Sequence, residues 1–407
     1  MVNLLTKVGF SAVVVLAVLF QVFLKDSVWM LLGIGRVMQP LSDFPYTCRR
    51  IVDPRLEACE DMWLSQSTRQ MFLACSDSMS RQSWMPSIGK LNVTGRSERD
   101  AIVALDIDKP VGDGFQMRTL KTPGFSGTHG DGLINVVGFT GMENSAGGID
   151  LMLVNLRPSA DPESGKFLDQ YALGANTTID HFTTGPEATE MKHVHTYADQ
   201  GISTPNRVAV LDDKTFYITN DHGPHKVGLQ SQLAMFLGTA NMHYCEANAP
   251  CKQVASNLKF PNGLVRKDDM LYVPDSAAGT LSIYRILPSK DLEKVDEVKL
   301  GYGLDNASVD ENGDIWVAAF PVTAAIFAAY DDPHGARTPT AVLRLRKTQG
   351  KYVVDKVIED ADGELLPAVT TVVHDAKTGR LFLSSVISPF IAVCEPKEYH
   401  NLAIDVP

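Results

Sequence analysis

The stretch PNGLVRKDDMLYVPDS, residues 261–276, joins an Asn-Gly pair to a run of alternating apolar residues. Two similar stretches lie elsewhere, PNRVAVLDDKTFYITND from Pro205 and DNASVDENGDIWVAA from Asp305. Each begins with asparagine or next to one, continues as a short run rich in Val, Ile, Tyr and Phe, and breaks at Asp, Asn or Gly. These stretches predict a repeated unit of two β-strands joined by a tight turn.

Six such units follow one another along a chain with little helical periodicity after residue 50. Their irregular spacing indicates insertions of different length between units. The predicted fold is therefore all-β, a six-bladed β-propeller. The units open at Glu60, His129, Asn206, Asn262, Asn306 and Thr371.

The opening residues matter because, in a propeller, the first residue of each innermost strand lies at the mouth of the central channel. Together with Asp305, the opening residues would form one ring of carboxylate and amide oxygens. Such a cage suits a hard cation such as Ca²⁺ better than zinc. Alternatively, asparagine before a strand only forms the turn by bonding its own backbone.

Charge and composition narrow the classes of partner. The chain carries 37 basic and 48 acidic residues, a net charge of -11, and 44% of its residues are hydrophobic. This composition is typical of a globular protein with a large core. The net negative field excludes nucleic acid as an electrostatic partner and favours cations.

The N-terminus predicts a membrane segment, because residues 8–24 contain no charge. We favour an uncleaved signal anchor over a cleaved signal peptide or a buried core helix, since no small-x-small cleavage site follows. Residues 28–38 are expected to form an interfacial amphipathic helix. The predicted division is residues 1–40 for the anchor and this helix and 41–407 for the propeller. The chain is expected in the secretory pathway, membrane-anchored with a lumenal or extracellular propeller, or secreted.

Six cysteines fit an oxidising compartment. Cys245 and Cys251 suit a local bridge. Cys59 and Cys75 face each other across a predicted hairpin, with two buried free thiols as the alternative. The sequons at Asn92 and Asn176 fit the same compartment.

Several motifs, in matching order and spacing over about residues 45–397, resemble the calcium-dependent paraoxonase/arylesterase lactonases. They are CEDMWL at 59, THG at 128, VAVLDDKTFYITNDH at 208, FPNGL at 260, LDNASVD at 304 and VCEP at 393. The resemblance implies a six-bladed propeller that hydrolyses lactones or aryl esters. It also implies a disulfide between Cys48 and Cys394, which lie near the two ends of the folded part.

The resemblance further implies one catalytic calcium that polarises the substrate carbonyl. Its ligands would be the residues that the repeat phase places in the ring, namely Glu60, Asn206, Asn262, Asp305 and Asn306.

His129 matches the family's proposed general base. The second family histidine has no counterpart here, the aligned residue being about Phe139. Phe260 matches an aromatic residue of the substrate pocket, and Thr371 is assigned to the same pocket from its place at the channel mouth.

A second, structural calcium of the family is expected to be absent. Asp61 and Asp131 match two of its ligands, but Arg207 stands where the family has an aspartate, and a guanidinium cannot ligate a cation. Arg207 is expected to bridge Asp61 and Asp131 instead.

Two weaker signals remain. His193 and His195 share one strand face and could hold zinc, although a solvated strand face is the simpler interpretation. The loop after Cys75, with Trp84 and Met85, is either a lid over the channel mouth or an ordinary surface loop.

The sequence thus favours a Ca²⁺-dependent hydrolase of lactones or aryl esters. The alternative is a calcium-containing propeller without hydrolysis, acting as a binding or scaffold protein or as a non-hydrolytic tailoring enzyme.

Overall fold

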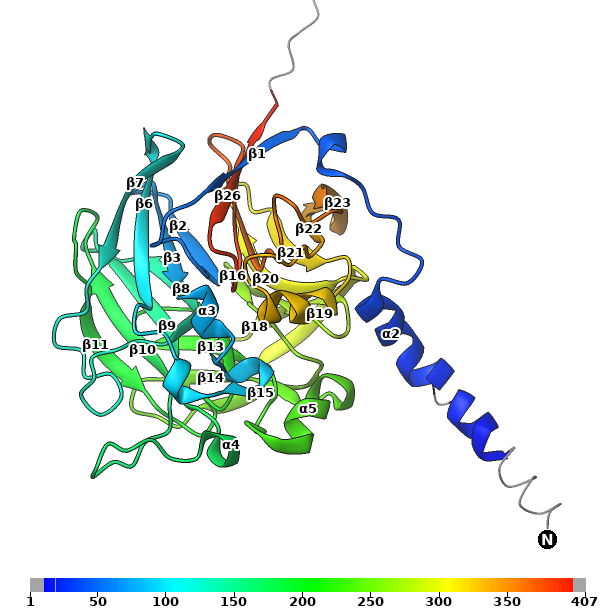
Figure 1. Ribbon diagram of the computed structural model, residues 1–407, viewed down its shortest axis with the longest axis horizontal. Coiled ribbons are helices and arrows are strands. Elements are labelled where there is room, and N and C mark those ends of the chain that lie inside the picture. Colours follow the sequence, from blue (N-terminus) through cyan, green and yellow to red (C-terminus); the bar gives the residue numbers. More distant parts are fainter. Residues whose placement is uncertain (1–10, 19, 398–407) are drawn as a thin grey trace, which may run out of the picture.

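The structure, a computed structural model that describes residues 11–18 and 20–397, is a ring of six antiparallel sheets with four strands each (Figure 1). This confirms the predicted six-bladed β-propeller. The first three blades are β2 (Asp61–Ser65), β3 (Gln70–Cys75), β6 (Ala101–Val111) and β7 (Gly114–Leu120); β8 (Val136–Glu143), β9 (Ile149–Arg157), β10 (Asn176–Thr184) and β11 (Lys192–Tyr197); β12 (Pro205–Val210), β13 (Thr215–Asn220), β14 (Ala240–Glu246) and β15 (Lys252–Leu258).

The last three blades are β16 (Val265–Lys267), β17 (Met270–Asp275), β18 (Thr280–Ile286) and β19 (Leu292–Lys299); β20 (Gly303–Val309), β21 (Ile315–Phe320), β22 (Thr340–Thr348) and β23 (Lys351–Asp360); β24 (Thr371–Asp375), β25 (Arg380–Ser384), β26 (Ile391–Pro396) and β1 (Tyr46–Ile51).

Short elements connect the blades or precede them. They are η1 (Phe20–Leu24), α2 (Lys25–Leu32), η2 (Leu41–Asp43), α3 (Ser78–Arg81), β4 (Trp84–Met85), η3 (Pro86–Ile88), β5 (Lys90–Leu91), η4 (Val93–Gly95), α4 (Gln170–Leu173), α5 (Gly228–Leu237) and α6 (Ala325–Asp331).

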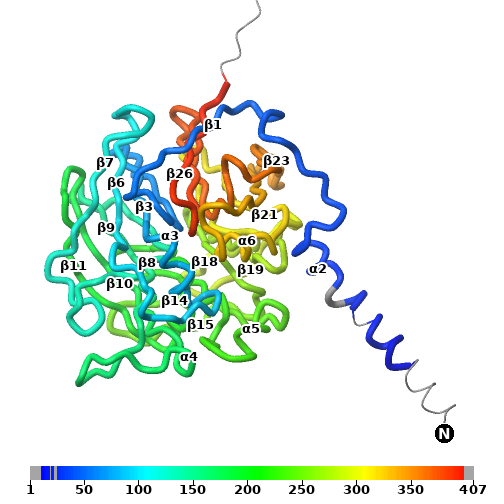
Figure 2. The backbone as a smooth tube through the Cα atoms, in the orientation of Figure 1, coloured from blue at the N-terminus to red at the C-terminus, as the bar shows by residue number. Residues whose placement is uncertain are grey.

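Both ends of the folded chain build the sixth blade. β1, near the N-terminus, pairs with β26, near the C-terminus, and Figure 2 shows this blue segment running beside the red strand. Cys48 lies opposite Cys394 in this pairing, and the two form a disulfide as the resemblance implies. Because the bond closes a loop of almost the whole propeller, it stabilises the fold by about 5 kcal/mol on a chain-entropy estimate.

The predicted repeat phase is right for most blades. β2 begins directly after Glu60, β12 contains Asn206 as its second residue, and β24 begins at Thr371. It is wrong for the second blade, whose inner strand β8 begins at Val136 and not near His129. A long connection separates β7 from β8, and its Gly-rich turn has the same local pattern as the start of a unit.

The core lies between the blades, since each blade packs against two neighbours. Middle strands such as β3 and β21 are therefore buried along their whole length. Short strands buried on both faces are continuous apolar runs and do not alternate.

The N-terminal segment leaves the propeller at one edge as a helix (Figure 1). In the described part of the chain, no single helix has the length and apolarity needed to cross a membrane; Ser11–Val22 and Lys25–Leu32, with a bend of 61° between them, satisfy both criteria only as a pair. Residues 8–10 and 19 of the predicted anchor lie outside the described residues. The signal anchor and the domain boundary at residue 40 stay predictions.

Candidate metal centre and ligand cavity

The five predicted ligands converge at one end of the channel, and we refer to them as the oxygen ring. They come from four blades and are all buried: Glu60, Asn206, Asn262, Asp305 and Asn306. All but Asn306 line a cavity of about 410 Å³. Asn306 contacts this group, since its Nδ2 donates to Glu60 Oε1 over 3.3 Å.

Irregular strand pairing turns these side chains toward the channel. The register of β12 on β13 shifts between Pro205 and Val208, around Asn206. The register of β20 on β21 shifts between Leu304 and Ala307, around the Asp305-Asn306 pair. A bulge of this kind redirects a side chain and is frequent beside functional sites. The strand patterns in the sequence carry no sign of these bulges.

Glycine next to the ring allows the blades to approach closely. A Cβ on Gly263 would lie 1.8 Å from Asn306 Oδ1, and a Cβ on Gly138 would lie 2.1 Å from the carbonyl oxygen of Asn206. Neither position can hold a larger residue without moving the ring. The glycine of the FPNGL motif is thus explained by this contact.

Three oxygens of the ring are buried with no hydrogen-bond donor in the part of the chain that the structure describes. They are Glu60 Oε2, Asp305 Oδ1 and Asn306 Oδ1. Buried acceptors are rarely left unpaired, because each costs about 1–3 kcal/mol. Unpaired oxygens gathered in one cluster are the kind of donor that a hard cation such as Ca²⁺ binds.

The two carboxyl groups of the ring form no ion pair within the described residues, and the more distant Arg81 and Arg207 only partly offset the cost of burying them. Burial, together with the neighbouring Asp61, raises the pKa of Glu60 to about 8. Burial and then the proximity of Glu60 raise the pKa of Asp305 well above its usual range. A bound cation would remove this penalty, since it favours both ionised forms.

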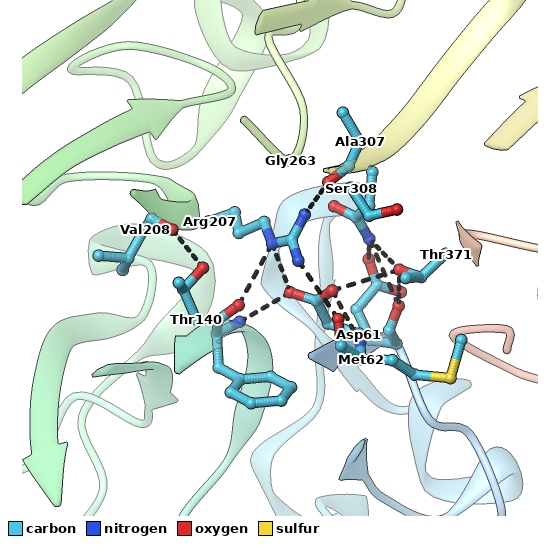
Figure 3. A network of polar contacts seen from close by, with 12 residues as sticks. Asp61, Met62, Thr140, Arg207, Val208, Gly263, Ala307, Ser308 and Thr371 are labelled. Atoms are coloured by element: carbon cyan, nitrogen blue, oxygen red, sulfur yellow. Dashed lines mark hydrogen bonds and ion pairs between the residues drawn. The ribbon is translucent and has the colours of Figure 1, made fainter. Parts of the chain in front are cut away.

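One residue further along the strands, a carboxylate is already neutralised. Arg207 Nε lies 2.8 Å from Asp61 Oδ2, which also accepts from the backbone N–H of Phe139 over 2.9 Å (Figure 3). The Arg207 guanidinium further donates to the carbonyl oxygens of Phe139, Ala307 and Met62. This ion-pair layer confirms the predicted bridge between Arg207 and Asp61.

The predicted bridge from Arg207 to Asp131 is wrong. Asp131 lies in the loop before β8, where Arg96 contacts it at 2.5 Å and its other oxygen caps the backbone N–H groups of Thr128 and Leu133. Arg207 faces a second cavity of about 400 Å³ whose lining does not include the oxygen ring. The ion-pair layer thus separates two parts of the channel.

The structure does not bring His129 to the ring. His129 is exposed in the loop between β7 and β8, with a φ of 52°. Its ring packs near Gly165 and does not line the cavity. Phe139, aligned with the second family histidine, is buried in the core with its backbone bonded to Asp61. The catalytic role predicted for His129 has no support in this arrangement.

A different histidine, which the sequence interpretation did not single out, lines the cavity. His222 Nδ1 lies 2.7 Å from Asp221 Oδ1, and its ring packs edge-on against Phe260 at a centroid distance of 5.1 Å. Phe260 itself lines the cavity, as the resemblance implies. In the sequence, His222 is the last residue of the string TNDH. A histidine just after a predicted strand resembles a simple turn residue, so this position was missed.

Thr371 does not line the cavity, contrary to its predicted place in the substrate pocket. Its buried hydroxyl donates to the Glu60 carbonyl oxygen over 2.8 Å and accepts from Asn306 Nδ2 over 2.8 Å. Thr371 thus supports the ring from behind. Its neighbour Thr370 lines the cavity instead.

The rest of the cavity wall is mostly apolar. The loop after Cys75 contributes Met85, while Trp84 is buried and donates from Nε1 to the Leu156 carbonyl oxygen over 2.9 Å. This loop is therefore part of the wall. Tyr330 of α6 also lines the cavity, and burial raises the pKa of its phenol well above 10.

The remaining predictions concern sites away from the cavity. Disulfides join Cys59 to Cys75 and Cys245 to Cys251, which excludes the free-thiol alternative. Asn92 and Asn176 are exposed, and their glycosylation stays a prediction.

The histidine pair on β11 makes local contacts. His193 bonds Thr196 Oγ1 over 2.9 Å and His195 packs edge-on against Tyr197. Within the described ranges, no group of three or more His, Cys, Asp or Glu side chains is placed to hold a metal. The oxygen ring contains only two such side chains, because its other three members are asparagines.

Comparison with known proteins gives a consistent assignment. The family model Arylesterase matches residues 172–388, more than half of the chain. The chain is 29% identical over 163 residues to rat serum paraoxonase/arylesterase 2, covering 39% of this chain and 45% of that protein. It is 25% identical over 218 residues to mouse serum paraoxonase/arylesterase 1, covering 52% and 59%.

The name of a third similar protein mentions no esterase. Mechanosensory abnormality protein 6 of Caenorhabditis elegans is 24% identical over 200 residues, covering 47% of this chain and 53% of that protein. The matches span about half the length of each of these relatives.

Proposed function

This chain belongs to the arylesterase family, and we propose that it is a calcium-dependent hydrolase of lactones or aryl esters. The observation that carries the proposal is the set of three unpaired buried oxygens, from Glu60, Asp305 and Asn306, at the end of a mostly apolar cavity. An apolar pocket with a few convergent polar groups is typical of a small-molecule site.

The donor set fits calcium. Glu60 and Asp305 supply carboxylate oxygens, while Asn206, Asn262 and Asn306 supply amide oxygens, and no nitrogen or sulfur ligand is needed. When bound, the ion would polarise the substrate carbonyl and stabilise the oxyanion. The ion-pair layer already has its own cation in Arg207, so we propose one calcium per chain.

The proposed base is His222. With its Nδ1–H donated to Asp221, the imidazole would keep a lone pair on Nε2 for the proton of a water molecule. The water oxygen would bond to the carbonyl carbon, the ester C–O bond would break, and the proton would pass to the leaving oxygen. The products are a carboxylic acid and a phenol for an aryl ester, or a single hydroxy acid for a lactone.

The cavity suits a neutral, compact ester. Its volume of about 410 Å³ is within the range of small-ligand pockets, and Phe260 and Met85 offer apolar contact. A lactone or a phenyl ester has this character. Nucleic acid is not a proposed partner, because the net charge is -11.

A secretory location is also proposed. Three disulfides require an oxidising compartment in most organisms, and the N-terminal helix offers a means of membrane attachment.

A second candidate is a calcium-binding propeller without hydrolysis. It is favoured by the exposed position of His129 and by Phe139 in the place of the second family histidine.

The test is hydrolysis of phenyl acetate and a panel of aliphatic lactones with calcium or EGTA, using wild type, His222→Ala and His129→Ala. We expect turnover that EGTA abolishes, a loss of about 10²–10⁴-fold in His222→Ala, and little change in His129→Ala. Loss of turnover in His129→Ala alone would return the base to the predicted residue. No turnover with any substrate, despite bound calcium, would favour the binding protein.

A further inference from the structure

Helix α2 contributes one face to the ligand cavity. Ser27, Met30 and Leu31, spaced i, i+3 and i+4, all line it. On the other face of the helix, Trp29 is 39% exposed and Leu32 is 49% exposed. The helix therefore lies against the propeller with a defined side, although it precedes all the blades in sequence.

Specific contacts hold α2 in this position. The Leu31 carbonyl oxygen accepts from the backbone N–H of Ala324, just before α6, over 2.9 Å. Beyond the helix, the Arg36 guanidinium lies 3.6 Å from the centroid of the Tyr302 ring and donates to the Gly301 carbonyl oxygen over 2.5 Å. These contacts join the segment to the fourth and fifth blades.

Gly33 leaves no room for a side chain where the segment meets the residues before α6. Gly33 has a φ of 63°, and a Cβ there would lie 2.8 Å from the Pro321 carbonyl oxygen and 2.9 Å from Val322 Cγ2. Gly35 has a φ of 77° but nothing within 4 Å of its Cβ position. The two glycines share a backbone conformation, and only Gly33 is part of the docking contact.

The wall that α2 completes is apolar. α5 contributes Met235 and Phe236, and α6 contributes Ile326 and Phe327, to the same cavity. In such a wall, each ligand methylene that becomes buried strengthens binding. The residues that limit the space therefore set which ligand length binds best.

We propose that α2 is a fixed wall of this cavity and that Met30 and Leu31 determine the size of the apolar group that the cavity accepts. The inference rests on the proposed function only for its choice of lactones as ligands. It makes the N-terminal segment a determinant of specificity in addition to any role in attachment.

The first test compares Leu31→Ala with Leu32→Ala in the full chain with calcium. Binding of γ-lactones with alkyl side chains of increasing length is measured by thermal shift, so that turnover is not needed. Leu31→Ala should improve the affinity for the longest lactones relative to the shortest by about tenfold. Leu32→Ala should keep the wild-type profile, because Leu32 does not line the cavity.

The second test uses Gly33→Ala and Gly35→Ala, which share the cost of a positive φ. Gly33→Ala should displace α2 and flatten the dependence on chain length, whereas Gly35→Ala should preserve it. If Leu31→Ala and Leu32→Ala show the same dependence of affinity on alkyl-chain length, and Gly33→Ala and Gly35→Ala do so too, the inference is overturned. Binding of no lactone by any of these proteins would also overturn it. A changed profile without turnover would overturn the hydrolase proposal alone, and turnover with an unchanged profile would overturn the wall alone.

Discussion

Adjacent residues on the same strands form two layers of opposite character. In the oxygen ring, Glu60 and Asp305 are buried carboxyl groups with unpaired oxygens. In the ion-pair layer, Asp61 is equally buried but contacts Arg207 at 2.8 Å. One step along a strand therefore separates carboxylates with unpaired oxygens from a carboxylate that is paired with a cation of the chain itself.

This difference would restrict the proposed calcium to one level of the channel. A guanidinium fixed by Asp61 and by three backbone carbonyl groups cannot move aside for an ion. Its charge also repels a cation at close range, while it leaves the ring above accessible from the cavity. The predictions below alter one layer at a time.

The largest effect is expected from Arg207→Met. It leaves Asp61 buried without its partner, which should lower the free energy of unfolding by about 3–5 kcal/mol in urea titrations. Arg285→Met, which breaks an exposed pair with Glu293, is the control and should cost less than about 1 kcal/mol. Asp61→Asn combined with Arg207→Met should recover part of the loss. Equal stability of Arg207→Met and wild type would show that the layer is not a stabilising ion pair.

A smaller effect concerns pH in EGTA-treated protein. Because the pKa of Glu60 is about 8 in the fold against 4.5 for an ordinary glutamate, its contribution to stability is complete below about pH 4.5. It is lost as pH rises through about 8, since the folded state then has to ionise a buried group. The melting temperature of wild type should therefore fall relative to Glu60→Gln between pH 6 and 8. Parallel profiles would contradict the raised pKa.

The smallest effect is expected where a metal ion offsets the loss of Arg207. Arg207→Asp removes the partner of Asp61 and adds a second buried carboxylate, so without calcium this variant should be at least as unstable as Arg207→Met. At millimolar calcium a second ion should bind there and restore most of the thermal stability. His129→Ala is a control that should leave the ion count unchanged. A single ion in Arg207→Asp would show that more than the guanidinium keeps calcium from this layer.

Much of the fold could be predicted because it is encoded locally. Short runs of apolar residues, bounded by polar turn residues, located the inner strands at Glu60, Asn206 and Thr371. The placement failed at His129, since a local pattern does not tell whether a Gly-rich turn starts a strand or only a long connection. His222 was missed because its role depends on a cavity formed by several blades.

The contribution of α2 could not be predicted either. An apolar N-terminal helix has the same pattern whether it lies in a membrane or against a propeller. The contacts of Leu31, Gly33 and Arg36 with the propeller distinguish these positions. The ion pair of Arg207 with Asp61 was predictable, since this sequence has an arginine where the resembled family has a metal-ligating aspartate.

The most direct test of the two-layer account is a calorimetric calcium titration of EGTA-treated protein, with Glu60→Gln in parallel. The account predicts one calcium per chain in wild type and a loss of affinity of at least about 100-fold in Glu60→Gln, because the ring then loses one of its two carboxylates. No bound calcium in wild type, two ions per chain, or undiminished binding by Glu60→Gln would contradict it.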